Sequence, residues 1–418
     1  MRHVKWSWLF VFLFVSFPLF ADKPTEKKDT LLKMGGELRI RSETTINQGA
    51  ITGAAADDDS MVLLRARPYM EATPTDQIRV FLQPQFSRTF AQEESTIANG
   101  TNLDDFDLHQ GYIDFLGIGE GPVSIRLGRQ ELAYGTERLM GTFGWSNVGR
   151  SHDAAKITLG WEKFWVDSFF SWVQRAGGNQ YYGGGYGHWD VTETIDDEPF
   201  FIVFNDNDGA PAAGRLTVYT IGNRLTGMVG TSLDFNLEGA LQFGKSGGND
   251  IFAYAGHGSG GFTFDTPIKP RVGLEYNIAS GDSNPTGGTV KTFNNLIPTN
   301  HDKYGYMDFV GWRNIHNPRF SFSLKPAKDL TTALDYHAFF LMNSEDGLYR
   351  ASGARMRAGA VGASRFVGQE IDWLLKYKWN QWANFLLGYS FFKAGDFLAD
   401  TGMAKDAHFL YAQTQVNF

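Results

Sequence analysis

Most of the chain consists of short segments in which apolar and polar residues alternate with a period of two. The final residues, 408–418, show this pattern most clearly. One face carries Leu410, Ala412, Thr414, Val416 and Phe418, and the other carries Tyr411, Gln413, Gln415 and Asn417. A period of two places successive side chains on opposite faces of a β-strand. Such a strand, closed by a terminal aromatic residue, is typical of outer-membrane barrels. The alternative is an edge strand of a soluble sheet, which would rarely leave this residue exposed.

The same alternation recurs along the chain, and the polar faces repeatedly carry charged residues. It is found at residues 37–43, 79–87, 123–130, 271–277, 319–325 and 370–376. A soluble sandwich would show a similar pattern with its apolar face turned inward. Charge on the polar face of strand after strand instead favours a barrel with lipid outside and water inside. In such a barrel we expect Phe418 to be the assembly signal that the barrel-insertion machinery reads.

The connections between these segments are alternately short and long. The short ones are residues 73–76, 117–121, 160–163, 326–329 and 380–381, and the long ones are residues 47–60, 89–105, 131–152, 281–317 and 343–367. Outer-membrane barrels have short periplasmic turns and long external loops. We therefore predict an all-β fold: a transmembrane antiparallel barrel of about 18 strands with both termini in the periplasm. If the weakest segments, 180–189 and 198–205, are loops, the number falls to about 16.

The beginning of the chain predicts secretion. Arg2 and Lys5 precede an apolar run at residues 6–20, so we predict a signal peptide at residues 1–21. The run is shorter than the roughly 20 residues of a spanning helix, which disfavours a membrane anchor. We predict that residues 22–36 form a short polar periplasmic tail and that residues 37–418 form a single barrel domain. Together these features predict the outer membrane of a Gram-negative (diderm) bacterium, with lipid around the barrel.

The amino-acid composition limits the classes of function that the chain can have. Aromatic residues make up 15% of the chain, Gly occurs 48 times, Cys is absent and the formal net charge is -8. Aromatic girdles and tight turns account for the first two values. We expect no enzyme activity, no cofactor, no metal and no nucleic-acid partner. The acidic residues Asp57–Asp59 could bind calcium, although a solvated loop tip is the simpler interpretation. We expect the barrel to be a monomer.

Several long motifs resemble one known family. They are LHQGYIDF from Leu108, VSIRLGRQELAYGTERLMGTFGWSNVGRSHDAAKI from Val123, ASGDSNPTGGTVKTFNNLIPTNHDKYGYMDFVGWRNI from Ala279, and GQEIDWLLKYKWNQWANFLLGYSFFKAGDFL from Gly368. Together they resemble the alginate export family of outer-membrane porins. The resemblance implies a diffusion channel that exports alginate or a related polyuronate. A less selective nutrient-uptake porin and a surface adhesin or structural barrel are the alternatives.

Arginines are the candidate selectivity residues. They are Arg39, Arg41, Arg65 and Arg67 on the early strands, and Arg126, Arg129, Arg138 and Arg150 in and after the strand at residues 123–130. A guanidinium group pairs with a carboxylate through two parallel hydrogen bonds and keeps its charge at ordinary pH. We predict that these groups face the lumen and order an anionic polysaccharide or a small anionic solute. Alternatively, they brace the lumen through pairs with carboxylates.

The long connection at residues 131–152 is too apolar for a free surface loop. We predict that it folds into the barrel and builds a constriction, with Tyr134 and Trp145 as anchors. Glu131 or Asp153 is expected to pair with one of the loop arginines, Arg138 or Arg150. The alternative is a lid that stacks on neighbouring external loops.

Overall fold

The computed structural model describes residues 31–52, 58–90, 102–175, 178–207 and 214–418. The predicted signal peptide, most of the predicted tail, and Asp57 lie outside these residues. No helix in the described part of the chain is long and apolar enough to cross a membrane.

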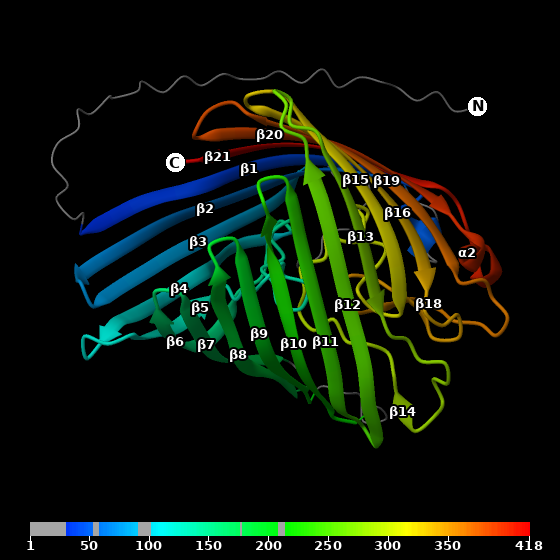
Figure 1. Cartoon of the computed structure of the whole chain (residues 1–418), viewed down its shortest axis with the longest axis horizontal. Helices are drawn as coiled ribbons and strands as arrows, with labels where there is room; N and C mark the ends of the chain where they lie inside the picture. Colours follow the sequence, from blue (N-terminus) through cyan, green and yellow to red (C-terminus); the bar gives the residue numbers. More distant parts are fainter. Residues whose placement is uncertain (1–30, 53–57, 91–101, 176–177, 208–213) are drawn as a thin grey trace.

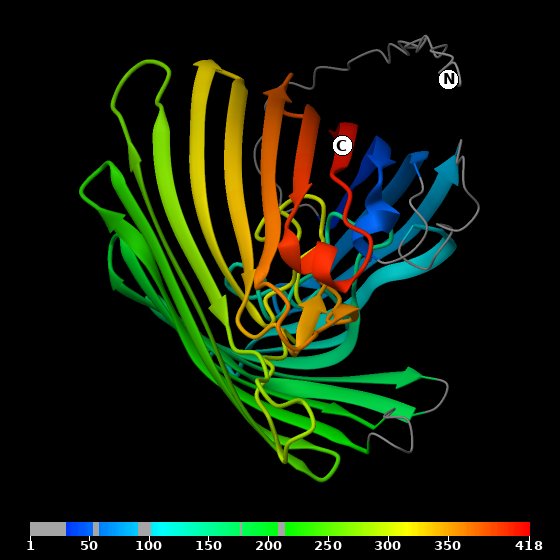
Figure 2. The same cartoon turned by 90° about the vertical axis from the view of Figure 1, so that its right-hand side faces the viewer.

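The described residues form a closed barrel of 18 antiparallel strands (Figures 1 and 2). The strands are β1 (Leu32–Ile46), β2 (Asp59–Thr75), β3 (Ile78–Phe90), β4 (Asp104–Ile118), β5 (Val123–Gln130), β6 (His152–Trp161), β7 (Phe164–Arg175), β8 (Gly178–Thr192), β9 (Ile195–Asp206), β10 (Leu216–Val229), β11 (Leu233–Ser246), β12 (Asn249–Thr263), β13 (Arg271–Ala279), β15 (Ile315–Ala327), β16 (Leu330–Leu341), β19 (Phe366–Lys378), β20 (Ala383–Ala394) and β21 (Ala407–Asn417). Each strand pairs with its neighbours in sequence, and β1 also pairs with β21, which closes the wall. Closure leaves no unpaired strand edge, as a lipid environment requires.

The predicted number of strands is confirmed, because the two weak segments form β8 and β9. The predicted boundary of the tail is wrong: β1 begins at Leu32, not at Glu37. Pairing with the last residue extends this strand. Gly36 N–H donates to the Phe418 carbonyl oxygen at 2.7 Å, and Phe418 N–H donates to the Gly36 carbonyl oxygen at 3.0 Å. A side chain at Gly36 would collide with the Phe418 ring, so glycine permits this close approach.

Alternate residues of each strand face lipid and lumen. In β1, Leu38 and Ile40 are exposed on the outer face, whereas Arg39 and Arg41 are buried on the inner face. Exposed Trp161, Trp189, Trp379 and Trp382 lie near the short turns. Aromatic residues at this position form the girdle expected where a barrel meets the membrane surface.

The two ends of the barrel differ. The short turns and both ends of the barrel chain lie at one end. The long connections at the other end carry α1 (Gln48–Thr52), β14 (Thr289–Val290), β17 (Gly347–Tyr349), β18 (Arg355–Ala358) and α2 (Asp396–Thr401). Several of these connections turn into the barrel (Figure 2). Phe293, Tyr304 and Trp312 of one of them are fully buried, so the half of the lumen near the long connections has its own apolar core.

We predict that deletion of Phe418 lowers the amount of folded protein in the outer membrane several-fold. The deletion removes the hydrogen bonds to Gly36 and the aromatic ring that rests on it. The heat-modifiable band on a gel measures the folded fraction. Phe418→Tyr keeps the ring and the main chain and should fold like the wild type. Equal folded yields from the deletion and from this control would contradict the prediction.

Candidate functional site

Residues 131–151, which connect β5 and β6, cross the lumen as expected from their apolar content; we call them the constriction loop. On one side, arginines of β1 and β2 donate to its carbonyl oxygens. Arg39 donates to Gly144 at 3.0 Å and to Ser146 at 2.9 Å, and Arg65 donates to both at 3.0 Å. In the same way, Arg41 donates to Trp145 at 2.8 Å and Arg67 to Val148 at 2.7 Å. One wall of the barrel therefore holds the loop through its main chain.

These four arginines are buried, between 1% and 7% exposed. Carboxylates beside them balance part of their charge: Glu43 lies 2.6 Å from Arg41, and Glu37 lies 2.7 Å from Arg65. Period-two alternation explains the cluster, because Arg39 faces Arg65 directly across the β1–β2 ladder. Their donors serve the loop, and little of their surface is left for a solute.

The opposite wall holds the loop through different contacts. Tyr134 stacks on Phe169 and Tyr186, with ring centroids 5.3 and 4.7 Å away, and its hydroxyl donates to Asp167 at 2.8 Å. Burial and the nearby Asp167 raise the pKa of Tyr134, so the hydroxyl stays a neutral donor. Arg138 donates to Glu275 of β13 at 3.0 Å. The loop thus spans the barrel from β1 to β13.

A second inward segment, residues 280–314, pairs with the constriction loop. Gly141 N–H donates to the Ile297 carbonyl oxygen at 3.0 Å, and Thr299 N–H donates to the Glu137 carbonyl oxygen at 2.9 Å. Arg150 donates to the carbonyl oxygens of Gly141, Ile297 and Pro298 at 3.1, 2.6 and 3.1 Å. Burial lowers the pKa of Arg150. The two segments form one unit inside the barrel.

The expected partners of the loop arginines are wrong. Glu131 accepts a hydrogen bond from His109 at 2.8 Å, and Asp153 pairs with Arg129 at 2.9 Å. The predicted position of Arg129 on the lumen face is also wrong. It lies three residues after Arg126, so the alternation of β5 places it on the opposite face from the lumen. There it contacts Asp107 and Asp153, whereas Arg126 pairs with lumen-facing Asp114.

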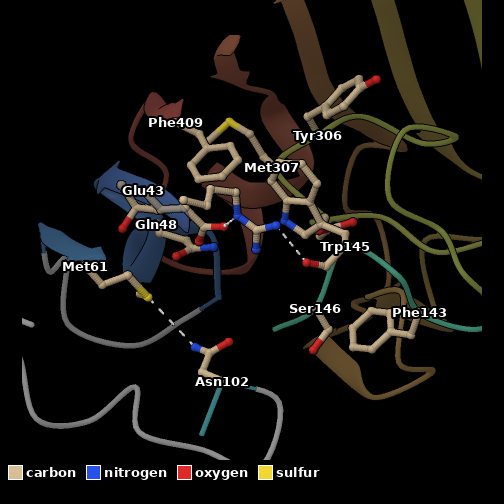
Figure 3. A pocket seen from close by; sticks show the side chains of 13 residues that line it. Glu43, Gln48, Met61, Asn102, Phe143, Trp145, Ser146, Tyr306, Met307 and Phe409 are labelled. Carbon is tan, nitrogen blue, oxygen red and sulfur yellow. Dashed lines mark hydrogen bonds and ion pairs between the residues drawn. The ribbon is translucent and has the colours of Figure 1, made fainter. Parts of the chain in front are cut away.

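Two cavities lie between the inward segments and the wall made by β1 and β21. The outer cavity, of about 240 Å³, is bordered by Arg41, Glu43, Gln48, Asp308 and Phe409 (Figure 3). The inner cavity, of about 380 Å³, is bordered by Arg39, Lys303, Lys376, Gln413 and Gln415. Both are lined by Trp145 and Tyr306. These two side chains therefore lie at the boundary between the cavities.

Trp145 is held tightly at this boundary. Its ring stacks on His301 with centroids 3.9 Å apart, and the Arg41 guanidinium lies 3.8 Å from the ring centroid. His301 also packs edge-on against Tyr306 at 4.8 Å. The sequence analysis missed His301 and Tyr306, since nothing local in the sequence shows that residues so far from Trp145 meet it.

Six further basic side chains line the lumen, most of them in the half near the short turns, and we call them the inner basic residues. They are Arg79, Arg126, Lys156, Arg224, Arg271 and Arg319. Each pairs with a carboxylate of another strand, and this strand is the direct neighbour in every pair except Arg271 of β13 with Asp234 of β11. Of these six, Arg126 is one of the selectivity residues predicted from the sequence. The usable signal for the others was a basic residue on the polar face of an alternating strand.

We predict that the double substitution Arg39→Gln/Arg65→Gln raises mean single-channel conductance about twofold or more and adds current noise. It frees the carbonyl oxygens of Gly144 and Ser146, so the loop can leave its position. Recordings in planar bilayers measure both quantities. Arg129→Gln removes an arginine from the outer face and is the matched control. A folded double variant that conducts like this control would show that the arginines do not hold the loop.

We also predict that Trp145→Ala raises conductance, by about twofold or less, because it joins the two cavities. Trp172→Ala removes an exposed tryptophan of β7 and should leave conductance unchanged. If the two variants give equal conductance, the solute path does not pass Trp145.

Comparisons with known proteins agree with this architecture. The family model described as alginate export matches residues 30–412. The chain is similar in structure to OccAB1 of Acinetobacter baumannii, with a TM-score of 0.59 and 12% identity over 92% of this chain and 96% of that one. OccK8 (OprE) of Pseudomonas aeruginosa gives a TM-score of 0.58 and 12% identity over 93% and 98%. The outer membrane protein OprD of P. aeruginosa gives a TM-score of 0.56 and 11% identity over 92% of this chain and 94% of that one. No curated protein sequence matches the chain.

Proposed function

The chain belongs to the alginate export family, and from this membership we propose that it is a diffusion channel for an anionic polysaccharide, alginate or a related polyuronate. Family and fold support an outer-membrane channel of a Gram-negative bacterium. In the proposal, a single chain exports the polymer down its concentration gradient.

The exposure of the inner basic residues is the observation that supports an anionic solute. In most of these pairs the basic side chain is more exposed to the lumen than its carboxylate partner. Arg79 is 30% exposed against 3% for Asp114, and Lys156 is 22% exposed against 6% for Asp167. Arg319 is likewise more exposed than Asp335. Arg271, in contrast, is slightly less exposed than Asp234. A solute in this half of the lumen would meet more positive than negative surface.

The pairing also suits transport. A cation that already has a carboxylate partner attracts a passing anion more weakly than a free cation would. Conduction requires binding that favours entry and still allows release. Six such groups around the wall would offer repeated shallow contacts to a charged polymer.

We predict that the channel prefers chloride to potassium in reversal-potential measurements across a salt gradient. Arg79→Gln/Lys156→Gln should reduce this preference several-fold, because it removes accessible positive charge and leaves the carboxylates. Oligouronates added to one side should block the current, and neutral oligosaccharides of equal length should not.

Arg129→Gln, which removes one positive charge from the outer face, is the control for selectivity. A cation-selective channel would contradict the proposal. Conductance without charge preference would favour a less selective uptake porin, and a folded barrel without conductance would favour a structural or adhesive role.

A further inference from the structure

The inner cavity carries more positive than negative charge. The cations on its border are Arg39, Arg65, Lys303 and Lys376. Arg65 pairs with Glu37 at 2.7 Å, and Lys303 pairs with Asp302 at 2.8 Å. Arg39 and Lys376 form no ion pair with any residue that the structure describes. Two cations of this cavity are therefore left without a carboxylate partner.

The remaining carboxylate on the border, Glu137, does not pair with either of them. It accepts hydrogen bonds from the Thr142 N–H at 2.9 Å and from the Thr299 hydroxyl at 2.6 Å. Glu137 can therefore offset at most one of the two unpaired charges. A cavity with a net positive charge and low-dielectric walls attracts an anion.

Lys376 is the cation that a solute can reach. It shares the inner face of β19 with the buried Leu374, and it is exposed. Arg39, in contrast, is 3% exposed, so it adds positive potential to the cavity but offers little surface for contact. An ammonium group has three donors and binds a carboxylate through charge-assisted hydrogen bonds. Unlike the inner basic residues, Lys376 has no carboxylate partner that would compete with a solute.

The strand register places two amide side chains beside Lys376. Leu386 of β20 faces Lys376 across one ladder and Gln413 of β21 across the other. Lys376 and Gln413 are thus two strand spacings apart, about 10 Å, with Leu386 between them. Gln415 follows on the same face of β21 and faces Arg39 across the ladder with β1. An apolar patch at Leu386 is therefore bordered by one cation and two amides.

This arrangement fits one residue of a polyuronate. A uronate has a carboxylate, several hydroxyl groups and an apolar face of C–H groups. Lys376 suits the carboxylate, the amides of Gln413 and Gln415 can donate to and accept from hydroxyl groups, and Leu386 can pack against the C–H face. The volume of about 380 Å³ lies within the usual range of small-molecule sites, about 300–1,000 Å³.

We propose that the inner cavity is a binding subsite for one uronate residue of the transported polymer, with Lys376 binding its carboxylate. This inference rests on the proposed function, because it names the residues that hold the polymer. Trp145 and Tyr306 separate the cavity from the outer one, so the subsite lies directly beside the constriction. The inner basic residues supply shallow contacts along the lumen, and the subsite positions one sugar residue at the constriction.

Block of the single-channel current by trimannuronate tests the subsite in the folded full-length barrel. Lys376→Gln should raise the concentration for half-maximal block about tenfold, because charge-assisted hydrogen bonds are lost. Lys376→Arg keeps the charge and should be blocked nearly like the wild type. The matched control is Lys393→Gln, which removes the same charge from the outer face of β20, where exposed Leu387 and Tyr389 also lie. Equal block of the two Gln variants would overturn the proposal.

A second variant separates a sugar site from simple attraction of charge. Gln413→Leu changes no charge, so weaker block by trimannuronate in this variant requires contact with the sugar; we expect the block to weaken several-fold. Glucuronate should compete with trimannuronate, and acetate at the same concentration should not. Unchanged block of Gln413→Leu, or equal competition by acetate, would overturn the assignment of a sugar site.

The outcomes also separate this inference from the proposed function. An anion-selective wild type that trimannuronate blocks, together with an unaffected Lys376→Gln variant, would leave the proposed function standing without the subsite. A cation-selective wild type, or one that trimannuronate does not block, would contradict the proposed function itself and the subsite with it.

Discussion

The hydrogen bonds from arginines of β1 and β2 to the constriction loop determine the shape of the lumen. A barrel of 18 strands encloses a wide space, and lipid outside offers nothing that could keep a loop within it. Arg39 and Arg65 provide this constraint by donating to the same two carbonyl oxygens, those of Gly144 and Ser146. Main-chain carbonyl oxygens cannot be lost by substitution of the loop residues. Charged donors make these hydrogen bonds stronger than neutral ones, and burial protects them from competing water.

This constraint divides the basic residues of the barrel between two tasks. The arginines of β1 and β2 are buried and hold the loop. The inner basic residues are partly exposed, and their carboxylate partners are mostly withdrawn into the wall. Selectivity in our account therefore arises in the half of the lumen near the short turns. In the same account, Trp145, which stacks on His301, limits the width of the path.

Much of the fold could be predicted from the sequence, because strand alternation is a local property. Segments 180–189 and 198–205 showed the weakest pattern, in the first of them because Gly183–Gly185 interrupt the alternation, yet both are strands. The face of Arg129 was predictable from its spacing to Arg126, because residues three apart in a strand lie on opposite faces. The prediction wrongly placed both on the lumen face. The partners of Arg138 were not predictable: Glu275 is 137 residues away, and their contact depends on the closure of the whole barrel. The same holds for His301, which meets Trp145 only in the folded lumen.

The central claim is that the constriction loop limits the flow and the inner basic residues select the charge. The most direct test is the reversal potential of a folded variant that lacks residues 136–147, recorded together with its conductance. Our account predicts higher conductance with the preference for anions retained, since the inner basic residues remain and the arginines of β1 and β2 become exposed. Loss of the anion preference on removal of the loop would contradict the account.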